Sequence, residues 1–273
     1  MVRVGLIGCG TIGSRVALTL ARKYRSVARI VALHDADPSR ARSLARRLPS
    51  HPPVVALSAL LRRSQLVLEA ASVDAAAKVV GPALRAHRSI FVMSVGGLLI
   101  NRTWQGLLRA SRGRVYIPSG ALAGLDGMKA MALGRITRAT LTSRKPPRAL
   151  ASAPYLQRRG VRLAGVKRPT VVFHGSPEAV VKAFPQNTNV AAALTLAVSH
   201  GKAAARRPSI RIRVVADPTI TRNIHEVEIL GDCGRLWTRV ESRPSRNPKT
   251  SELAVRSAIA TLERIFGSAQ IGT

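Results

Sequence analysis

The sequence predicts an α/β fold in which a doubly wound parallel sheet forms a first domain and an α+β domain follows it. Three patterns indicate this fold class. Apolar runs alternate with helix-like runs over residues 1–119, polar and apolar residues alternate in several later runs, and helical spacing resumes after residue 250. Apolar strands separated by helices are typical of a parallel sheet covered on both faces, whereas period-two strands are typical of a sheet with one face in water.

The first domain is predicted from strands and helices that alternate along the chain. Asp37-Pro38-Ser39 marks the start of one helix, because a capping carboxylate is followed by a proline in the first turn. The predicted strands are 2–7, 28–33, 66–69, 89–93 and 115–118, and the predicted helices are 11–22, 37–48 and 73–87.

The second domain is predicted from strands with period-two patterning, as in an antiparallel sheet with one wet face. Residues 231–234 lie between two such strands and favour a hairpin turn. We expect residues 1–119, completed by a returning helix at 250–273, to form the first domain and residues 120–249 to form the second. The predicted strands of the second domain are 138–143, 210–215, 226–230 and 236–240, and its predicted helices are 177–184 and 190–199.

Composition favours a globular protein of the cytoplasm. The 273 residues are 46% hydrophobic but only 3% aromatic, so aliphatic side chains must form the cores. No apolar run reaches the roughly 18–20 residues of a membrane span, and the apolar run after Met1 is too short for a signal peptide. Cys9 and Cys233 have no metal-type neighbours, so we expect reduced thiols and no metal site.

The net charge is unusually high at +31, from 44 lysines and arginines against 13 aspartates and glutamates. Such a field attracts polyanions and small anions. The basic residues are dispersed in doublets, without a recognition motif and with few aromatic residues for base stacking. We therefore expect nucleic acid to bind only non-specifically, through the basic surface and at low salt.

A glycine-rich turn follows the first predicted strand and opens the first predicted helix, which is the context of a dinucleotide-binding Rossmann turn. The first glycine allows the tight turn, the second lets the backbone approach a pyrophosphate, and the third lets the helix pack against the sheet. Amide groups at the helix start then face the phosphates. The positions predicted to bind a nicotinamide dinucleotide here are Gly8, Cys9, Gly10, Thr11, Ile12 and Gly13.

Asp35 ends the second predicted strand, where a carboxylate binds the adenosine ribose and favours NAD. Asp37 is an alternative for this role, although its position fits a helix cap better. Arg40 and Arg42 would suit the 2′-phosphate of NADP, so NAD is preferred and NADP stays possible.

Small residues follow the third predicted strand at the carboxyl edge of the sheet, where cofactors lie in this fold. Ala71 and Ser72 are predicted to let the nicotinamide ribose approach. An equally good interpretation of Ser72 is a helix cap without any ligand.

Several short motifs beyond the glycine turn stand in order along nearly the whole chain. They are SGALAGLD at 119–126, TSRKPP at 142–147, FHGS at 173–176, FPQNTNVAA at 184–192, ADP and TRNIHE within 216–226, and NPKTS at 247–251. With these motifs the chain resembles the L-aspartate dehydrogenases. The segment 200–207 is longer and more basic than is usual in that family, and the net charge is also unusual for it.

The resemblance implies NAD(P)-dependent oxidative deamination of L-aspartate to iminoaspartate, which hydrolyses to oxaloacetate and ammonia or feeds NAD biosynthesis. It also implies that the α+β domain serves catalysis and dimerisation, and hence a homodimer. The family's catalytic histidine falls on His225, and its cofactor-contacting alanine and asparagine fall on Ala123 and Asn189.

The residues by themselves leave two histidines open for proton transfer. Hydride removal from the Cα of an amino acid needs a neutral amine, imine hydrolysis needs an activated water, and a histidine titrating near neutrality serves either step. His225 lies in a polar cluster and His174 precedes a Gly-Ser pair, so without the resemblance they are equally good candidates. We expect His225 to be catalytic, and Asn223, His174 and Lys145 to contact the substrate.

Two other hypotheses fit parts of the sequence. A related Rossmann reductase of another amino or imino acid, such as an enzyme of a dihydrodipicolinate or homoserine pathway, would share the glycine turn. A non-catalytic NAD-binding or nucleic-acid-binding protein would share the fold alone. Turnover of a panel of substrates distinguishes the first hypothesis from an L-aspartate dehydrogenase. Salt-dependent binding of polyanions without any turnover would favour the second hypothesis.

Overall fold

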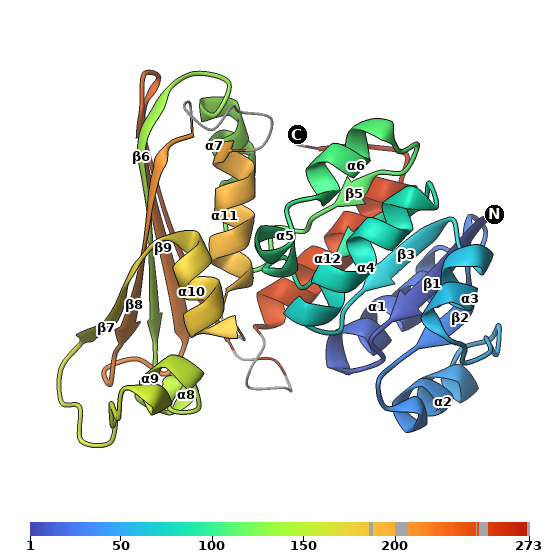
Figure 1. Cartoon of the computed structure of the whole chain (residues 1–273), viewed down its shortest axis with the longest axis horizontal. Coiled ribbons are helices and arrows are strands. Elements are labelled where there is room, and N and C mark those ends of the chain that lie inside the picture. Colours follow the sequence, from blue (N-terminus) through green and yellow to red (C-terminus); the bar gives the residue numbers. More distant parts are fainter. Residues whose placement is uncertain (186–187, 200–206, 244, 246–250, 272–273) are drawn as a thin grey trace. The chain divides into compact units, whose positions relative to one another are not determined.

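The computed structural model describes residues 1–273 except 186–187, 200–206, 244, 246–250 and 272–273. The described chain divides into two compact units (Figure 1). Unit 1 comprises Met1–Pro118 and Val255–Ile271, and unit 2 comprises Ser119–Ala254. The division falls one residue before the boundary predicted at 119/120.

Unit 1 is built on a parallel five-stranded sheet of order β2-β1-β3-β4-β5. Its strands are β1 (Val2–Ile7), β2 (Ala28–His34), β3 (Leu66–Glu69), β4 (Ser89–Val92) and β5 (Val115–Tyr116). Its helices are α1 (Thr11–Lys23), α2 (Pro38–Arg47), α3 (Leu57–Arg63), α4 (Val73–Arg85), α5 (Gly97–Ile100), α6 (Trp104–Ala110) and most of α12 (Glu252–Phe266). This order confirms the predicted doubly wound sheet.

The core of unit 1 is mainly aliphatic, as the low aromatic content of the sequence predicts. Side chains of β1, β2 and β3 are shielded from water beneath α1 and α12. Ala258 and Leu262 of α12 are fully buried in this core. At the end of α12, Glu263 accepts hydrogen bonds from Lys23 and from the Tyr24 hydroxyl. The last helix of the chain is therefore an integral part of the first unit.

Unit 2 is built on a five-stranded sheet of order β10-β9-β6-β8-β7. Its strands are β6 (Ile136–Lys145), β7 (Thr170–Gly175), β8 (Ser209–Ala216), β9 (Asn223–Gly231) and β10 (Gly234–Ser242). Its helices are α7 (Leu125–Met131), α8 (Pro147–Leu150), α9 (Pro154–Arg158), α10 (Pro177–Ala183) and α11 (Asn189–Ser199). The predicted hairpin is present, because Gly231 and Gly234 pair across the turn between β9 and β10.

The expectation of a fully antiparallel second sheet is wrong, because β6 and β8 are parallel. The chain between them runs through β7, α10 and α11, which is long enough for the crossover that a parallel pair needs. The sequence prediction missed β7 and the short helices, and the remaining elements lie within a few residues of their predicted bounds.

The sheet of unit 2 has two different faces. Helices α7, α10 and α11 lie along one of them, called the inner face here, and no helix of the described part of unit 2 covers the other, the outer face (Figure 1). Strand β8 shows the alternation: Ile210, Ile212 and Val214 are buried, whereas Arg211 and Arg213 are exposed. No helix of the described residues is long and apolar enough to cross a membrane.

Candidate active site

The glycine turn joins β1 to α1 as the sequence predicts. Gly8 has a φ of +89°, a conformation that side-chain-bearing residues rarely adopt, and a Cβ on Gly13 would lie 1.9 Å from the Gly8 carbonyl oxygen. A Cβ on Gly10 would meet nothing within 4 Å. Gly10 is also the N-cap of α1 and provides no side chain to satisfy the amides of the first turn. This open, uncapped helix start fits a pyrophosphate.

The Asp35 carboxylate braces the glycine turn from the end of β2. Its Oδ2 accepts a hydrogen bond of 2.6 Å from the Cys9 amide, and its Oδ1 accepts one of 2.8 Å from the Asp37 amide. Each oxygen keeps a lone pair for a ribose hydroxyl. Asp37 instead caps α2, accepting from the Ser39 amide, and lies 3.3 Å from the Arg40 guanidinium. Asp35 is thus the better placed of the two carboxylates for an adenosine ribose.

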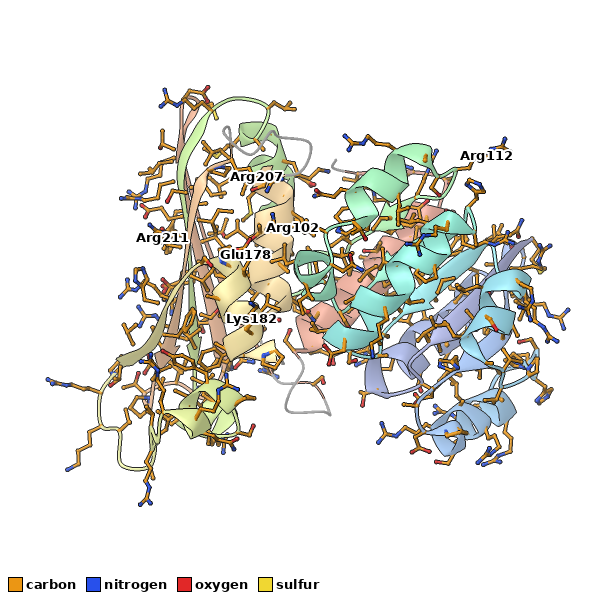
Figure 2. All side chains as sticks on the ribbon, in the orientation of Figure 1. Arg102, Arg112, Glu178, Lys182, Arg207 and Arg211 are labelled. Atoms are coloured by element: carbon orange, nitrogen blue, oxygen red, sulfur yellow. The ribbon has the colours of Figure 1, made fainter. Side chains whose placement is uncertain are left out.

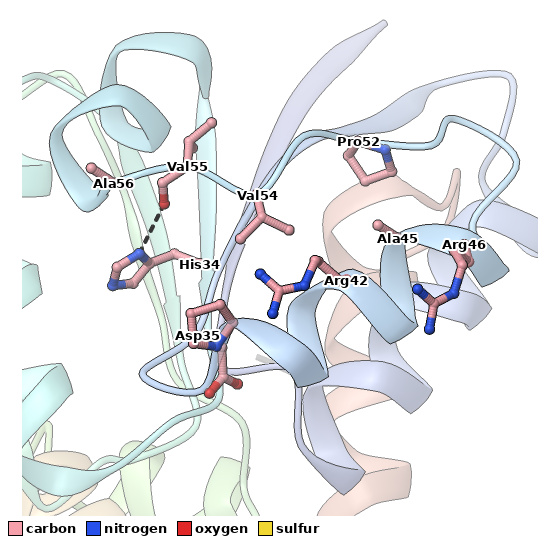
Figure 3. Close-up of a pocket in the computed structure, with 10 residues that line it drawn as sticks. His34, Asp35, Arg42, Ala45, Arg46, Pro52, Val54, Val55 and Ala56 are labelled. Atoms are coloured by element: carbon pink, nitrogen blue, oxygen red, sulfur yellow. Dashed lines mark hydrogen bonds between the residues drawn. The ribbon is translucent and has the colours of Figure 1, made fainter.

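A pocket of about 740 Å³ opens beside Asp35. In the close-up of Figure 3, Arg42 and Arg46 of α2 line one side of it, and the Arg42 guanidinium points toward the side formed by His34 and Val54. His34 is held there by donating from Nδ1 to the Val55 carbonyl at 2.9 Å. The pocket has the size and the mixed apolar and cationic lining that an adenosine moiety requires.

Glu69, which sequence reasoning did not single out, orders the loops after β3 and β4. Its fully buried carboxylate accepts hydrogen bonds from the Ala71 amide and from both the amide and the hydroxyl of Ser94, at 2.8–2.9 Å. Burial raises the pKa of Glu69. The only sequence signal was an acidic residue ending a buried strand.

Ser72 caps α4 by accepting from the Ala75 amide, so its structural role is accounted for without a ligand.

A second polar cluster lies on the inner face of the sheet in unit 2. Ser143 of β6 pairs directly with His225 of β9, and the Ser143 Oγ lies 2.9 Å from the His225 Nδ1. Asn223 lies two residues before His225 on the same strand, and Lys145 lies two residues beyond Ser143. We call Ser143, Lys145, Asn223 and His225 the inner cluster; all four are buried.

The hydrogen bond from Ser143 decides which imidazole nitrogen can meet a ligand. Ser143 has no other partner among the described residues, so its hydroxyl is best satisfied by donating to Nδ1. The Nε2 of His225 then carries the proton and is the nitrogen left for a substrate. The structure thus identifies Ser143 as the residue that orients His225, whereas in the sequence it was only one member of the TSRKPP motif.

The two bases of the inner cluster have lowered pKa values. Burial, followed by the charge of Lys145, lowers the pKa of His225 to about 3, and burial lowers the pKa of Lys145 to about 8. Unlike a free histidine, His225 therefore does not titrate near neutrality in the folded chain. Its imidazole is neutral at pH 7, and of these two bases Lys145 is the one with the pKa nearer to neutrality.

One hydroxyl beside the inner cluster lacks a hydrogen-bond partner. Ser242 of β10 pairs with Asn223 in the sheet register, and its buried Oγ has no partner among the described residues. Buried polar groups are nearly always satisfied in proteins, so an orphaned hydroxyl here is consistent with a ligand-binding surface.

His174 is not part of the inner cluster. It pairs with Arg213, which alternates with the buried Val214, so the exposed His174 lies on the outer face while His225 lies on the inner face. A β-bulge between Val171 and Phe173 sets this orientation. The sequence prediction that His174 joins His225 at the substrate is not supported, and we leave His174 out of the site.

The two positions implied by the resemblance for cofactor contact lie elsewhere in unit 2. Ala123 is exposed in the loop before α7, and Asn189 is the exposed first residue of α11. The neighbouring Asn187 and the basic segment 200–206 lie outside the described residues, as do 247–250 of the NPKTS motif.

Replacing Ser143 by Ala should allow His225 to populate both neutral tautomers instead of the Nε2–H tautomer alone. We expect the nitrogen NMR signals of His225 in protein carrying ¹⁵N-histidine to lose the pure Nε2–H pattern, because Nδ1 no longer accepts a hydroxyl proton. The lost hydrogen bond should also lower the free energy of unfolding by about 1 kcal/mol. Ser143→Thr, which keeps a hydroxyl, should retain the wild-type spectrum. An unchanged His225 spectrum in Ser143→Ala would contradict this assignment.

Comparisons with known proteins cover the whole chain. The family model described as "Aspartate dehydrogenase, C-terminal" matches residues 126–265, and the model described as "Homoserine dehydrogenase, NAD binding domain" matches residues 8–117. The chain is 40% identical to an L-aspartate dehydrogenase of Methanosarcina barkeri over the full length of both proteins. It is 35% identical to L-aspartate dehydrogenase 3 of Bordetella bronchiseptica, over 99% of this chain and 97% of that one.

Solved structures agree on the fold. The crystal structure of an aspartate dehydrogenase from Thermotoga maritima superposes with a TM-score of 0.70 at 24% identity, covering all of both chains. The glycine turn lies in the segment matched by the NAD-binding model, and the inner cluster lies in the segment matched by the C-terminal model.

Proposed function

The chain belongs to the L-aspartate dehydrogenase family, and on that premise we propose that it oxidises L-aspartate to iminoaspartate with NAD or NADP. The observation that carries the proposal is the inner cluster, a buried group of proton-handling and hydrogen-bonding side chains within the family-matched segment. The imine product is either hydrolysed to oxaloacetate and ammonia or passed on to NAD biosynthesis.

The cofactor is held, in this proposal, by the turn of Gly8, Gly10 and Gly13 and by the Asp35 carboxylate. When bound, NAD(P) supplies the acceptor for the hydride that leaves Cα of the substrate. Asp35 favours NAD, because a carboxylate binds the free ribose hydroxyls and repels a 2′-phosphate. The loop that Glu69 braces, with Ala71 and Ser72, and the family positions Ala123 and Asn189 complete the proposed cofactor contacts.

Substrate recognition is assigned to the inner cluster. L-Aspartate carries two carboxylates, and the cluster offers the Nε2–H of His225, the amide of Asn223 and the amino group of Lys145 as donors. His225 is the proposed catalytic residue: its neutral ring holds a proton at Nε2 against the reacting end of the substrate. Ser143 positions that ring through Nδ1.

A turnover assay with a substrate panel tests the proposed function. Purified protein should reduce NAD, and more weakly NADP, with L-aspartate, and should give little or no product with D-aspartate, L-glutamate, L-malate, glycine or L-homoserine. The nicotinamide absorbance and the release of ammonia measure the same reaction independently. Turnover of another amino or hydroxy acid together with none of L-aspartate would refute the substrate assignment.

A homodimer formed through the outer face is also part of the proposal. That face carries Trp237, whose side chain is 57% exposed, between alternating charges such as Arg239 and Glu226 at 2.9 Å and Arg235 and Glu228 at 2.8 Å. An exposed aromatic side chain among charges of both signs suits a self-complementary interface.

Light scattering at micromolar concentration tests the dimer. The wild type should have the mass of two chains, and Trp237→Asp should shift it toward one, because a carboxylate would replace an interfacial aromatic ring. Leu133→Asp, at another highly exposed apolar position, should leave the mass unchanged. A monomeric wild type would contradict the proposal.

The basic side chains form a general positive field and no recognition site among the described residues. Basic side chains are spread over both units in Figure 2, where Arg112 belongs to unit 1 and Arg211 to the outer face of β8. We propose that this field concentrates dianionic substrate and binds nucleic acid only non-specifically, so that added salt abolishes the binding. Both cysteines are free, in keeping with the cytoplasm as the proposed compartment.

A further inference from the structure

Lys145 is the one lysine or arginine of the described residues whose side chain is buried. The chain has 44 such residues, and the others in the described part keep at least part of their side chains in water, where a cation is cheaply solvated. Burying an ammonium group costs several kcal/mol in order-of-magnitude terms, so this exception calls for a function.

The position of Lys145 is set by the sheet and not by a loop. It is the last residue of β6, pairs with Ala216 of β8, and its carbonyl accepts a 2.8 Å hydrogen bond from the Asp217 amide. Along β6, Lys145 has the same parity as Ser143, so both side chains belong to the inner face that carries His225. The Lys145 amino group and the His225 imidazole therefore belong to one polar surface.

We propose that Lys145 is the proton acceptor for the α-ammonium group of L-aspartate, a second catalytic residue beside His225; this rests on the proposed function of the same cluster. The neutral amine of Lys145 takes one proton, the N–H bond of the substrate breaks, and its electron pair stays on the substrate nitrogen. That pair would then be available for the C=N bond of the imine, for which a bound NAD(P) would supply the hydride acceptor. Lys145 ends as an ammonium group and returns its proton to water.

His225 is poorly suited to this step in the folded chain. Its Nδ1 accepts the hydrogen bond from Ser143, and its Nε2 carries the one ring proton. A base with a pKa near 3 is too weak to deprotonate an ammonium group effectively. Lys145, with its pKa lowered to about 8, is partly neutral at neutral pH and is a far stronger base. The two residues therefore have different roles: His225 donates a hydrogen bond to the substrate, and Lys145 accepts the proton of its α-ammonium group.

The ionisable groups on the described elements around Lys145 do not account for its lowered pKa. From β9 it faces His225, which is neutral at pH 7. After β8, the carboxylate of Asp217 is held by the Thr219 amide and hydroxyl and lies 3.8 Å from Arg144. Helix α11, which packs against β6, carries no ionisable side chain. Burial is the cause of the lowered pKa, and the substrate itself is the charge that changes on binding.

The alternative role for Lys145 is a permanently charged clamp for a substrate carboxylate. Arginine separates the two roles, because it keeps the positive charge and the hydrogen bonds but cannot give up a proton near neutral pH. If Lys145 is the base, Lys145→Arg should lose activity. If Lys145 only binds a carboxylate, the same variant should stay active. Lys145→Ala should leave room for a small primary amine to act in place of the missing side chain.

The experiment compares Lys145→Arg, Lys145→Ala and the exposed-lysine control Lys167→Ala in the full chain. We expect kcat/KM for L-aspartate to fall on the order of 10²–10⁴-fold in both Lys145 variants and to stay unchanged in the control. Ethylamine should restore activity to Lys145→Ala in proportion to its neutral form, and not to Lys145→Arg. The inhibition constant of succinate, a dicarboxylate without an amine, should change little in Lys145→Arg. Thermal unfolding and NADH binding verify that each variant folds.

The wild-type pH profile gives a second measurement that needs no variant. Because the proposed base must be deprotonated, kcat/KM should fall about ten-fold per pH unit below a pKa near 8. Near-wild-type turnover in Lys145→Arg, absence of amine rescue, or a flat profile through pH 8 would each overturn the assignment. Failure of the proposed function would look different, because the wild type itself would then not oxidise L-aspartate.

Discussion

Replacing His225 by Ala is expected to lower kcat for L-aspartate on the order of 10²–10³-fold, the range for loss of one positioned hydrogen-bond donor at a reacting group. The truncation removes the Nε2–H that the proposal places against the reacting end of the substrate and leaves the Ser143 hydroxyl without its acceptor. The NADH dissociation constant should change little, because the glycine turn and Asp35 belong to unit 1. Steady-state kinetics and fluorescence titration of NADH measure the two effects separately.

His174→Ala is the matched control for this prediction. It removes an imidazole from the same sheet, but from the exposed outer face. Its kcat and KM should stay close to those of the wild type. A His225 variant that keeps near-normal turnover would remove that residue from the mechanism, and a large loss in His174→Ala would mean that the outer face is part of the site.

Gly13→Ala is expected to weaken NADH binding at least ten-fold and to destabilise the chain by roughly 1–3 kcal/mol, the usual cost of overpacking. The new Cβ would lie 1.9 Å from the Gly8 carbonyl oxygen, so the turn between β1 and α1 must open. The better helix propensity of Ala, worth about 1 kcal/mol, offsets only part of this cost. Thermal unfolding and NADH titration provide the two readouts.

Gly10→Ala sharpens the same experiment because its Cβ meets no protein atom within 4 Å. It should unfold like the wild type yet bind NADH poorly, since the methyl group would enter the space assigned to the pyrophosphate. Wild-type NADH affinity in Gly10→Ala would argue that the dinucleotide does not cross this turn. Wild-type stability and affinity in Gly13→Ala would refute the close packing of α1 on β1.

Much of the fold and half of the candidate site could be predicted from the sequence because their determinants are local. The glycines of the turn, the proline at the start of α2 and the alternation along β8 each depend on neighbours in the chain. Asp35 could be predicted for the same reason, because it comes directly after a strand that the apolar pattern identifies.

The rest depends on contacts between distant segments. Ser143 and His225 are 82 residues apart, and only the pairing of β6 with β9 brings them together. The place of His174 on the outer face could not be predicted, because strand β7 was not predicted and a β-bulge in it, which leaves no clear trace in the hydrophobic pattern, sets the orientation of His174. The low pKa of His225 likewise follows from burial by the whole unit and not from its neighbours in the motif.

The place of α12 in unit 1 bears on how the chain acquires its structure during synthesis. Ala258 and Leu262 are fully buried beside residues of β1 and β2, so the core of the first unit closes only after α12 has left the ribosome. Unit 2 is contiguous and is free to fold earlier. In the nascent chain, the nucleotide-binding half therefore matures after the half that carries His225, and a nascent chain whose residue 254 has just left the exit tunnel would display a folded second unit beside an unfinished first one.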